Sequence, residues 1–591
     1  MDLSGNNIQG LIPHCFGNLT SLTSLHLARN RLEGSIPNSI RHLCRLQSLD
    51  LSVNELSGSL TDSLGAPSEC LSYSLQMLSL DDNHFTGQLP NQLYMHTNLN
   101  TLSLYSNSLS GPLADSLGNL SMLSFLDISY NKFSGSILSE SHFSKLTNLK
   151  ALAISKNSLF LHVSPNWVPP FQATEIYMDS IKVGPHFPQW LCTQTKLNFL
   201  YMSNASISDA IPDWFGNFFW TCSYIDLSKN DIRGELPMRV EGRYMFEIDY
   251  RSTFEFSGNH LEFSSNHLTG EIPKWLCNLK DLAVLDISSN KLFGEIPSCF
   301  GKLQELEYLD LGNNHLFGHI PNSLGSLTNL HTLHLQNNKF KGGLPSSLQN
   351  LGRLVTLDLS ENGLMDVIPP WIGENLPSLR FLNFQKNKFF GDIPLQLCYL
   401  KDLQLLNLAN NNISGPIPRC FNNFTAMVNG FSIFLLNYVE NIHEDIKGLE
   451  LEYTTNLRFL ISIDLSENHI IGEIPLEVMS LRALNNLNLS RNNLSGTIPQ
   501  TIDNLSKIES LDLSMNALSG PIPQSLSSLN FLSYLNLSFN KLYGRIPTGH
   551  QLQTLDNPSI YIGNEGLCGV PLLKSCLLWF LGKCRSIFCK G

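Results

Sequence analysis

Charged residues are scarce in this sequence, and the basic ones do not cluster. Asp, Glu, Lys and Arg together make up 15% of the 591 residues, whereas roughly 25% is usual for soluble domains. The formal net charge is −12 at pH 7, and the chain contains no basic run. Binding to nucleic acid requires clustered Lys and Arg that contact phosphates. We therefore expect no nucleic-acid partner.

Long apolar runs are also missing. A membrane-spanning helix needs about 20 consecutive apolar residues, and the apolar stretch at Leu577–Leu581 is far shorter. The first residues, MDLSGNNIQG, lack the apolar run of a signal peptide. We therefore expect the chain as given to have neither a signal peptide nor a transmembrane helix.

The motifs of the common enzyme classes are absent. The sequence contains no G-x-S-x-G, no kinase signature, no HExxH and no glycine-rich phosphate loop before a helix. No CxxC pairs with a second such motif to form a zinc site. We expect a protein that is not an enzyme, binds no metal and needs no cofactor.

The sequence does contain one motif, repeated along most of its length. Residues 282–297 read LAVLDISSNKLFGEIP, and residues 484–499 read LNNLNLSRNNLSGTIP. The asparagine after each LxL recurs at a constant step in two series: Asn266, Asn290, Asn314, Asn338 and Asn362, then Asn468, Asn492, Asn516 and Asn540. Repetition at such a fixed period is the signature of a solenoid, in which each coil contacts only its neighbours.

Each repeat predicts one coil. The LxxLxL segment places its leucines on one side of a short strand, which can bury them only when strands stack about 4.8 Å apart in a parallel sheet. The recurring asparagine, here called the ladder asparagine, can bond backbone groups of the following turn. A later glycine such as Gly318 permits positive φ. The fold class predicted is an α/β solenoid, a curved leucine-rich-repeat superhelix with a parallel concave β-sheet and about 21–22 coils.

Breaks in the repeat predict the domain organisation. The step from Asn411 to Asn468 is not a whole number of repeat periods, and residues 421–457 lack the LxxLxL pattern. Smaller irregularities occur at Ile181 and Ala205, which replace ladder asparagines. We predict these segments: a main repeat array at 1–420, a non-repeat island at 421–457, a four-coil block at 458–547, a cap at 548–576 and an atypical tail at 577–591.

Cysteines and sequons together favour a secreted protein. Two candidate disulfides join cysteines slightly less than one repeat period apart, on the same flank of adjacent coils, and a third flanks a longer coil: Cys277 with Cys299, Cys398 with Cys420, and Cys44 with Cys70. No confident partner is apparent for Cys15, Cys192, Cys222, Cys584 and Cys589. The candidate N-glycosylation sites are Asn18, Asn119, Asn204, Asn412, Asn423, Asn488, Asn493, Asn504 and Asn536.

Ligand-binding candidates follow from the strand pattern, because the residue between the two leucines of LxL points away from the core. Asp286, Asp310, His334 and Asp358 take this position in four successive coils. Such a row could bind a cation or sense pH, but we favour a solvated acidic stripe, since carboxylates without desolvation make no functional pair. Exposed aromatic residues are preferred binding anchors, which adds Tyr105, Tyr130 and Tyr308.

The repeating LxxLxLxxNxLxGxIP unit resembles the plant extracellular leucine-rich repeat. An island followed by four coils resembles the ectodomain of plant receptor-like proteins, the kinase-less relatives of receptor-like kinases. Three stretches, VSPNWVPPFQ (163–172), KGLELEY (447–453) and GNEGLCGVPLLKSC (563–576), resemble the middle, the end of the island and the C-terminal cap of these ectodomains. The resemblance covers residues 1–576 and implies that Cys568 and Cys576 close the cap.

The resemblance implies a receptor in plant defence or development, on the extracellular side of the plasma membrane. It would bind a protein, peptide or glycan ligand on its concave face and signal through adaptor and co-receptor receptor-like kinases. By the same resemblance, the island and the last four coils would bind the co-receptor, through Lys447, Tyr453, Arg491, Met515, Tyr534 and Phe539. The family also has a signal peptide, an N-terminal cap and a transmembrane helix, so we expect this chain to be truncated at both ends.

Two alternatives stay open at this point. One is a soluble inhibitor of a secreted cell-wall hydrolase built from the same repeat, although such inhibitors are shorter and lack the island. The other is a truncated fragment without function.

Overall fold

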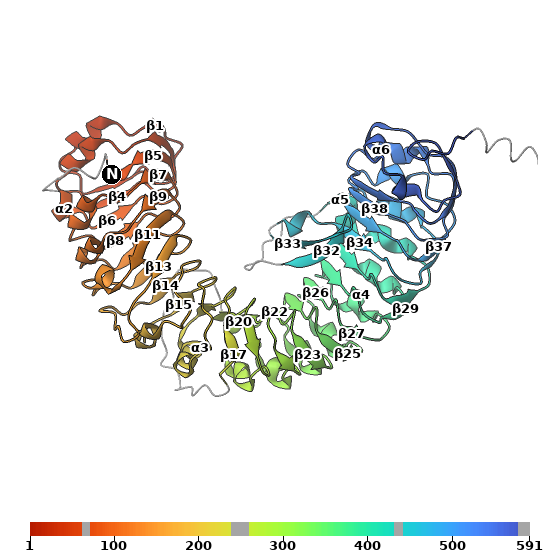
Figure 1. Cartoon of the computed structure of the whole chain (residues 1–591), viewed down its shortest axis with the longest axis horizontal. Coiled ribbons are helices and arrows are strands. Elements are labelled where there is room, and N and C mark those ends of the chain that lie inside the picture. The colour runs from red at the N-terminus through yellow and green to blue at the C-terminus, as the bar shows by residue number, and fades with distance from the viewer. Residues whose placement is uncertain (62–70, 238–258, 431–440, 455, 577–591) are drawn as a thin grey trace, which may run out of the picture. The chain divides into compact units, whose positions relative to one another are not determined.

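The structure is a computed structural model that describes residues 1–61, 71–237, 259–430, 441–454 and 456–576 (Figure 1). The chain forms two compact units: unit 1 is Met1–Trp275 with Asp286–Lys291, and unit 2 is Leu276–Leu285 with Leu292–Gly591. Cys70, Cys584, Cys589 and the expected tail at 577–591 lie outside the described residues.

A coil of either unit follows the order that the repeat predicts. In one coil of unit 2, Leu306, Leu309 and Leu311 are buried, and the central leucine lies in a three-residue strand, Tyr308–Asp310. A turn leads to a second strand, and the proline of the IP pair then precedes a short 3-10 helix. Proline fits this position because its fixed φ suits the start of the helix. The backbone N–H that proline lacks would have no partner inside the helix.

The LxL strands of unit 1 form a parallel sheet in chain order, each strand paired with the next through equivalent residues of neighbouring coils. These strands are β2 (Ser24–His26), β4 (Ser48–Asp50), β6 (Met77–Ser79), β8 (Thr101–Ser103), β10 (Phe125–Asp127), β12 (Ala151–Ala153), β14 (Glu175–Tyr177), β15 (Phe199–Tyr201), β16 (Tyr224–Asp226) and β18 (Asn259–Glu262). The outer surface of such a sheet is called the sheet face below.

Unit 2 repeats this arrangement, and its strands from β22 to β40 pair in chain order. Its strands are β22 (Tyr308–Asp310), β24 (Thr332–His334), β26 (Thr356–Asp358), β28 (Phe381–Asn383), β30 (Leu405–Asn407), β34 (Ser462–Asp464), β36 (Asn486–Asn488), β38 (Ser510–Asp512) and β40 (Tyr534–Asn536). β20 (Leu282–Asp286) crosses the division between the units.

The second strands of the coils form shorter parallel sheets. In unit 1 they are β1 (Gln9–Leu11), β3 (Arg31–Gly34), β5 (Glu55–Ser59), β7 (His84–Gly87), β9 (Ser108–Gly111), β11 (Lys132–Leu138), β13 (Ser158–Leu161), β17 (Arg233–Glu235) and β19 (His267–Thr269). In unit 2 they are β21 (Phe293–Gly294), β23 (His315–Gly318), β25 (Lys339–Gly342), β27 (Gly363–Leu364), β29 (Phe390–Asp392), β31 (Asn412–Ser414), β35 (Ile471–Glu473), β37 (Asn493–Ser495), β39 (Ser519–Gly520), β41 (Lys541–Arg545) and β42 (Gly566–Cys568).

Short helices complete the coils. Those from 1 to 278 are η1 (His14–Asn18), η2 (Asn38–His42), α2 (Leu71–Ser74), η3 (Asn91–Met95), η4 (Asp115–Asn119), η5 (Glu140–Phe143), η6 (Gln189–Thr193), η7 (Asp213–Asn217), α3 (Phe218–Thr221) and η8 (Lys274–Asn278). The later ones are η9 (Ser298–Lys302), η10 (Asn322–Ser326), η11 (Ser346–Asn350), α4 (Trp371–Asn375), η12 (Leu395–Tyr399), η13 (Arg419–Asn423), α5 (Thr425–Asn429), η14 (Leu457–Phe459), η15 (Leu476–Ser480), η16 (Ile502–Asn504), η17 (Gln524–Ser528), α6 (His550–Thr554) and η18 (Pro558–Tyr561).

The ladder asparagines bond the backbone as expected. The Nδ2 of Asn492 donates to the carbonyl oxygens of Leu489 and Ser490 in its own turn and of Leu465 in the preceding coil, and its Oδ1 accepts from the amide of Ile470. One side chain therefore satisfies four backbone groups that would otherwise be buried unpaired. Where Ala205 replaces the asparagine, Asn230 of the next coil accepts from its amide.

Three of the expected disulfides are present: Cys277–Cys299, Cys398–Cys420 and Cys568–Cys576. Cys44 is disulfide-bonded as well, and its expected partner lies outside the described residues. Cys15, Cys192 and Cys222 are free. The parallel strand series confirms the predicted α/β leucine-rich-repeat solenoid.

Candidate functional site

In unit 1 the sheet face carries partly exposed aromatic and acidic side chains. The two aromatic residues expected there, Tyr105 and Tyr130, lie side by side with ring centroids 5.1 Å apart. Tyr130 is 49% exposed. Asp127 lies in the neighbouring strand β10, and burial raises its pKa to about 6. The pair therefore combines an accessible aromatic surface with an acidic neighbour.

A second aromatic group on this face was missed by the sequence analysis. Tyr177, Tyr201, Tyr224 and His260 stack in order across β14, β15, β16 and β18. Successive ring centroids are 4.8, 4.3 and 5.0 Å apart, with interplanar angles of 22°, 16° and 26°. We call these four residues the tyrosine ladder. The recurrence of tyrosine at Tyr177 and Tyr201, in equivalent strand positions, could have revealed it.

Carboxylates accompany the tyrosine ladder. The hydroxyl of Tyr177 donates to Oε2 of Glu175 over 3.1 Å, and that of Tyr224 donates to Oε1 of Glu262 over 2.5 Å. Burial, reinforced by the charge of Asp226, raises the pKa of Glu262 to about 8. Burial also raises the pKa of Asp226. At these strands the sheet face therefore presents aromatic rings, with carboxyl groups beside the tyrosine hydroxyls.

The prediction that Asp310, His334 and Asp358 belong to a solvated acidic stripe is wrong. Asp310 is 1% exposed, His334 0% and Asp358 3%, and Tyr308 is also buried, at 4%. His334 Nδ1 lies 4.0 Å from Asp310 Oδ2, and burial raises the pKa of Asp358. The fourth member of the row, Asp286, belongs to unit 1 and is half-buried. The repeat pattern places these side chains on the sheet face, but it cannot show that the face is covered there.

A β-hairpin from the island packs on the sheet face of unit 2. Strands β32 (Ile442–Ile446) and β33 (Leu449–Tyr453) pair antiparallel, and their two-residue turn, Lys447 and Gly448, has positive φ at both positions, as a type I′ turn requires. Apolar residues of this hairpin pack on sheet-face residues of β28 and β30 and on a residue beside β26: Ile442 and Ile446 join Val355, Phe381 and Leu405 in one buried cluster.

A buried polar contact fixes the hairpin to the sheet. Glu444 is 1% exposed, and its two carboxylate oxygens accept hydrogen bonds from Asn407 Nδ2 over 2.8 Å and Ser462 Oγ over 2.7 Å. These donors lie on β30 and β34, strands that pair directly although the island separates them in sequence. The hairpin is therefore held by apolar packing and by a charge-assisted contact.

The co-receptor candidates form two groups in unit 2. At the tip of the hairpin, Lys447 makes an ion pair with Glu509 over 3.1 Å, while Tyr453 packs partly buried against the hairpin cluster. Tyr534 donates its hydroxyl to Asp512 over 3.2 Å. Three further candidates occupy the positive-φ position before a ladder asparagine: Arg491, Met515 and Phe539. Among these three, Met515 is 38% and Phe539 49% exposed, and Arg491 pairs with Glu467.

The candidate glycosylation sites differ in accessibility. Seven are exposed: Asn18, Asn119, Asn204, Asn412, Asn423, Asn493 and Asn504. Asn488 and Asn536 are half-buried on the sheet face, and their amides donate to the carboxylates of Asp464 and Asp512. Only the seven exposed side chains are free of such sheet-face contacts.

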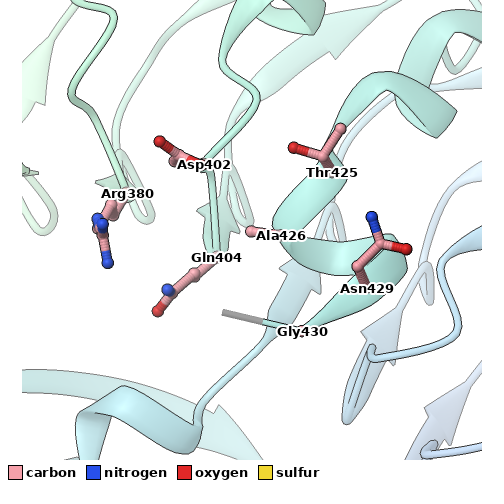
Figure 2. Close-up of a pocket in the computed structure, with 7 residues that line it drawn as sticks. All are labelled: Arg380, Asp402, Gln404, Thr425, Ala426, Asn429 and Gly430. Carbon is pink, nitrogen blue, oxygen red and sulfur yellow. The ribbon is translucent and has the colours of Figure 1, made fainter. Parts of the chain in front are cut away.

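A small polar pocket lies on one flank of unit 2 (Figure 2). Its polar lining comes from Arg380, Asp402, Gln404, Thr425 and Asn429. Figure 2 shows Arg380 and Gln404 facing this space opposite α5, which supplies Asn429. Gln404 is almost fully buried, and its Oε1 accepts no hydrogen bond in the described structure. The pocket offers polar groups but no reactive pair.

The described residues lack two further features. No helix there has the length and apolar character that crossing a membrane requires. Nor do three or more His, Cys, Asp or Glu side chains in that part of the chain gather as they would around a metal ion.

Comparison with family models identifies leucine-rich repeats along the chain. A model described as "Leucine-rich repeat region" matches residues 1–209. Two further repeat models match residues 282–340, 328–389 and 482–542, and residues 259–279 and 402–424. Together these segments cover more than half of the chain.

Curated relatives are plant receptor-like proteins. The chain is 41% identical over 121 residues to receptor-like protein EIX1 and 40% identical over 183 residues to EIX2, both of Solanum lycopersicum. These matches cover 20% and 25% of this chain, but only 12% and 18% of the relatives. Receptor-like protein 14 of Arabidopsis thaliana is 38% identical over 242 residues, which cover 37% of this chain and 24% of that protein. The matched segments thus span less than a quarter of the relatives' length.

Solved structures resemble nearly the whole chain. The ectodomain of the Arabidopsis receptor kinase HAESA, in complex with an IDA peptide hormone extended at its N-terminus, matches with a TM-score of 0.74 and 28% identity, over 98% of this chain and 91% of that one. A TDR receptor matches with a TM-score of 0.70 and 27% identity, over 96% and 92%. The repeat models show that the chain belongs to the leucine-rich-repeat proteins, and it is similar to plant receptor-like proteins and to the ectodomains of plant receptor kinases.

Proposed function

We propose that this chain is the ligand-recognition part of a receptor-like protein that acts through partner receptor kinases in plant defence or development. Members of this family bind rather than catalyse, so the chain is not an enzyme. The observation that carries the proposal is the sheet face of unit 1, where partly exposed aromatic side chains of neighbouring coils lie against one another on a regular parallel sheet. Rigid aromatic side chains are preferred anchors for binding proteins and peptides.

The solved relatives support a peptide or protein ligand. HAESA is described in complex with the peptide hormone IDA and the co-receptor SERK1, in a structure that matches this chain with a TM-score of 0.66. RGFR1 is described in complex with RGF2, also at a TM-score of 0.66. By analogy, the ligand of this chain would be a protein, peptide or glycan bound on the sheet face.

For the partner kinases we propose the rim of the last four coils. Met515 and Phe539 expose large apolar side chains from adjacent coils, beside Arg491. All three take the positive φ that the position before a ladder asparagine has throughout the described coils, so the backbone of the repeat holds these side chains at equivalent places. The hairpin tip at Lys447 contacts Glu509 of the same block, which gives a partner a second point of contact.

The proposed location is the extracellular side of the plasma membrane. The disulfides between adjacent coils suit an oxidising compartment, and seven sequons lie on exposed asparagines. The curated relatives are receptor-like proteins, which supports the same location.

Co-precipitation of the full chain with candidate adaptor and co-receptor kinases tests the proposal. We expect the wild-type chain to recover at least one kinase, and Met515→Asp combined with Phe539→Asp to reduce that recovery at least fivefold, roughly the loss of one buried apolar anchor. Aspartate tolerates positive φ better than most residues, so the fold should persist.

The matched control replaces two other exposed aromatic residues of unit 2. Phe293 and Phe317 are 46% and 45% exposed on β21 and β23, and Phe293→Asp with Phe317→Asp should leave recovery unchanged. Recovery of no kinase by the wild-type chain contradicts the proposed function. Equal loss in both double variants contradicts only the assignment of the rim.

A further inference from the structure

Large apolar side chains project into solvent from the second strands of unit 2. Phe390 on β29 is 42% exposed, and Val367, which forms a β-bridge with it, is 44% exposed. The adjacent Phe389 is fully buried, so the alternation of the strand directs Phe390 outward. We call Val367 and Phe390 together the Phe390 platform. Neighbouring apolar side chains on a polar surface often mark a contact site.

A glycosylation candidate lies directly beside the platform. In the parallel pair of β29 and β31, Phe390 is the register partner of Asn412. Asn412 is exposed while the following Ile413 is buried, so the side chain of Asn412 projects from the same surface as the ring of Phe390. Neighbouring strands lie about 4.8 Å apart, which brings the two side chains within reach of each other.

The side-chain amide of Asn412 is available for attachment of a glycan. In the described part of the chain this side chain forms no hydrogen bond. The side chain of Asn488, by contrast, donates to Asp464 over 2.9 Å. A glycan on Asn412 therefore breaks no contact of the fold.

The same arrangement occurs at a second place in unit 2. Ile471 on β35 is 51% exposed, and it is the register partner of Asn493 on β37, whose side chain is also exposed. Among the described second strands, Asn412 and Asn493 are the two asparagines that begin an N-x-S/T motif. Each of them lies opposite a large, exposed apolar side chain of the preceding coil.

The first sugar of an N-glycan fits the platform chemically. One face of a β-linked N-acetylglucosamine consists of C–H groups, whose slightly positive hydrogens suit the negative face of an aromatic ring. The hydroxyls and the acetamide stay at the edges of the sugar, in water. Since the side chains of Asn412 and Phe390 are of similar length, the sugar on Nδ2 starts at about the height of the ring above the strands. Covering the ring removes apolar surface from water, which favours the contact.

We propose that the Phe390 platform is a binding site for the first N-acetylglucosamine of a glycan on Asn412, so that the chain's own glycan covers this apolar surface. The tether to the neighbouring strand gives the sugar a high effective concentration at the ring, so even a weak contact is populated. The inference goes beyond the proposed function and rests only on its extracellular location, because N-glycans are added in the secretory pathway.

Hydrogen exchange of the full chain, secreted from plant cells that make only high-mannose glycans, tests this inference. Two backbone amides report on the contact: that of Phe390 donates to Asp366 over 3.0 Å, and that of Asn412 donates to Phe389 over 2.8 Å. Ser414→Ala removes the sequon and keeps Asn412. We expect these amides to exchange about three- to fivefold faster in Ser414→Ala than in the glycosylated wild type, the size of one aromatic contact.

Repeating the comparison without the ring locates the contact. In Phe390→Ser, removal of the sequon should change the exchange less than about 1.5-fold, because the sugar then has no ring to cover. The matched control is Phe317→Ser, since Phe317 is 45% exposed on β23 and lies opposite Lys339, which is not in a sequon. There the glycan should keep its full effect. Trimming with an endoglycosidase that leaves one N-acetylglucosamine should also keep it, because the first sugar makes the contact.

Four results overturn the inference: no glycan on Asn412 while other exposed sequons carry one, a glycan there that leaves both amides unchanged, an effect that persists in Phe390→Ser, or protection that is lost on trimming to one sugar. Each of them leaves the proposed function standing, since the kinase co-precipitation tests that function through the rim of unit 2. A secreted chain without any glycan would instead contradict the proposed location.

Discussion

At the scale of single residues, the ladder asparagine joins neighbouring coils through its side-chain amide. Asn492 is buried and bonds four backbone groups of two coils. A leucine in this place could fill the volume but would leave those donors and acceptors unpaired. This position requires a side-chain amide, because its NH2 group donates hydrogen bonds and its oxygen accepts one. That requirement explains why asparagine recurs with the period of the coil.

Replacing Asn492 with alanine should destabilise the chain by about 2–4 kcal/mol, because several buried backbone groups lose their partner at once. Chemical denaturation of protein made without glycosylation measures the effect. The adjacent Asn493 is exposed, and Asn493→Ala should cost less than about 0.5 kcal/mol. Similar losses in the two variants would show that the ladder contacts contribute little.

The carboxyl group of Glu262 predicts a pH dependence. Its pKa is about 8 in the folded chain, against an ordinary value of 4.5. Between these values the folded state holds a proton that the unfolded state has lost, so stability falls as pH rises through this window. Glu262→Gln should therefore be more stable than the wild type, and the difference should grow from about pH 4.5 to pH 8.

Thermal unfolding of both proteins across this pH range measures that difference. Glu473 lies exposed on β35, so Glu473→Gln serves as the control and should follow the wild type at every pH. Parallel curves for the wild type and Glu262→Gln would contradict the raised pKa.

At the scale of elements, the island hairpin β32–β33 differs from the coils in what stabilises it. A two-stranded hairpin is marginal by itself in water. Here alternate residues of β32, Ile442 and Ile446, pack against the sheet, and Glu444 between them bonds Asn407 and Ser462. The sequence signalled the island through the missing repeat pattern, and KGLELEY contains the turn. The covered sheet beneath it could not be foreseen, because no local pattern encodes contacts between residues so far apart.

Docking of the hairpin should depend on its apolar face. Ile442→Ala with Ile446→Ala is expected to weaken docking by about 2–5 kcal/mol, the usual cost of truncating buried aliphatic side chains. Hydrogen exchange of the amides in β32 and β33 reports the loss of protection. Leu449, in the same hairpin, is 64% exposed, and Leu449→Ala should leave the exchange unchanged. Equal exchange in both variants would mean that Glu444 alone holds the hairpin.

At the scale of the whole molecule, the sequons have an uneven distribution. No N-x-S/T occurs between Asn204 and Asn412. Asn488 and Asn536 differ from the other candidates, because their amides already bond the carboxylates of neighbouring strands. A glycan on Asn488 or Asn536 would break these hydrogen bonds to the carboxylates, whereas a glycan on any of the other candidate asparagines would leave them intact.

Glycopeptide mapping of the chain secreted from plant cells tests this distribution. We expect high occupancy at the seven exposed asparagines and at least about threefold lower occupancy at Asn488 and Asn536, because a glycan there competes with buried hydrogen bonds. Asn493 is the internal comparison, since it lies in the same coil as Asn488 but is exposed. Equal occupancy at Asn488 and Asn493 would contradict the expectation.

The sequence by itself determined the coil. Leucines at LxxLxL, the ladder asparagine, the positive-φ glycine and the proline act within one coil or between neighbours, so their constant period was sufficient to predict the solenoid, and the spacing of the cysteines to predict two disulfides. Only the tertiary structure decided which parts of the sheet face are accessible. It buried Asp310, His334 and Asp358, which the pattern had placed in solvent, and it stacked Tyr177, Tyr201, Tyr224 and His260, which the pattern had left unmarked. The physical reason is that burial of a side chain and stacking of a ring depend on what lies above the sheet and on the neighbouring strand, and a repeat motif specifies neither.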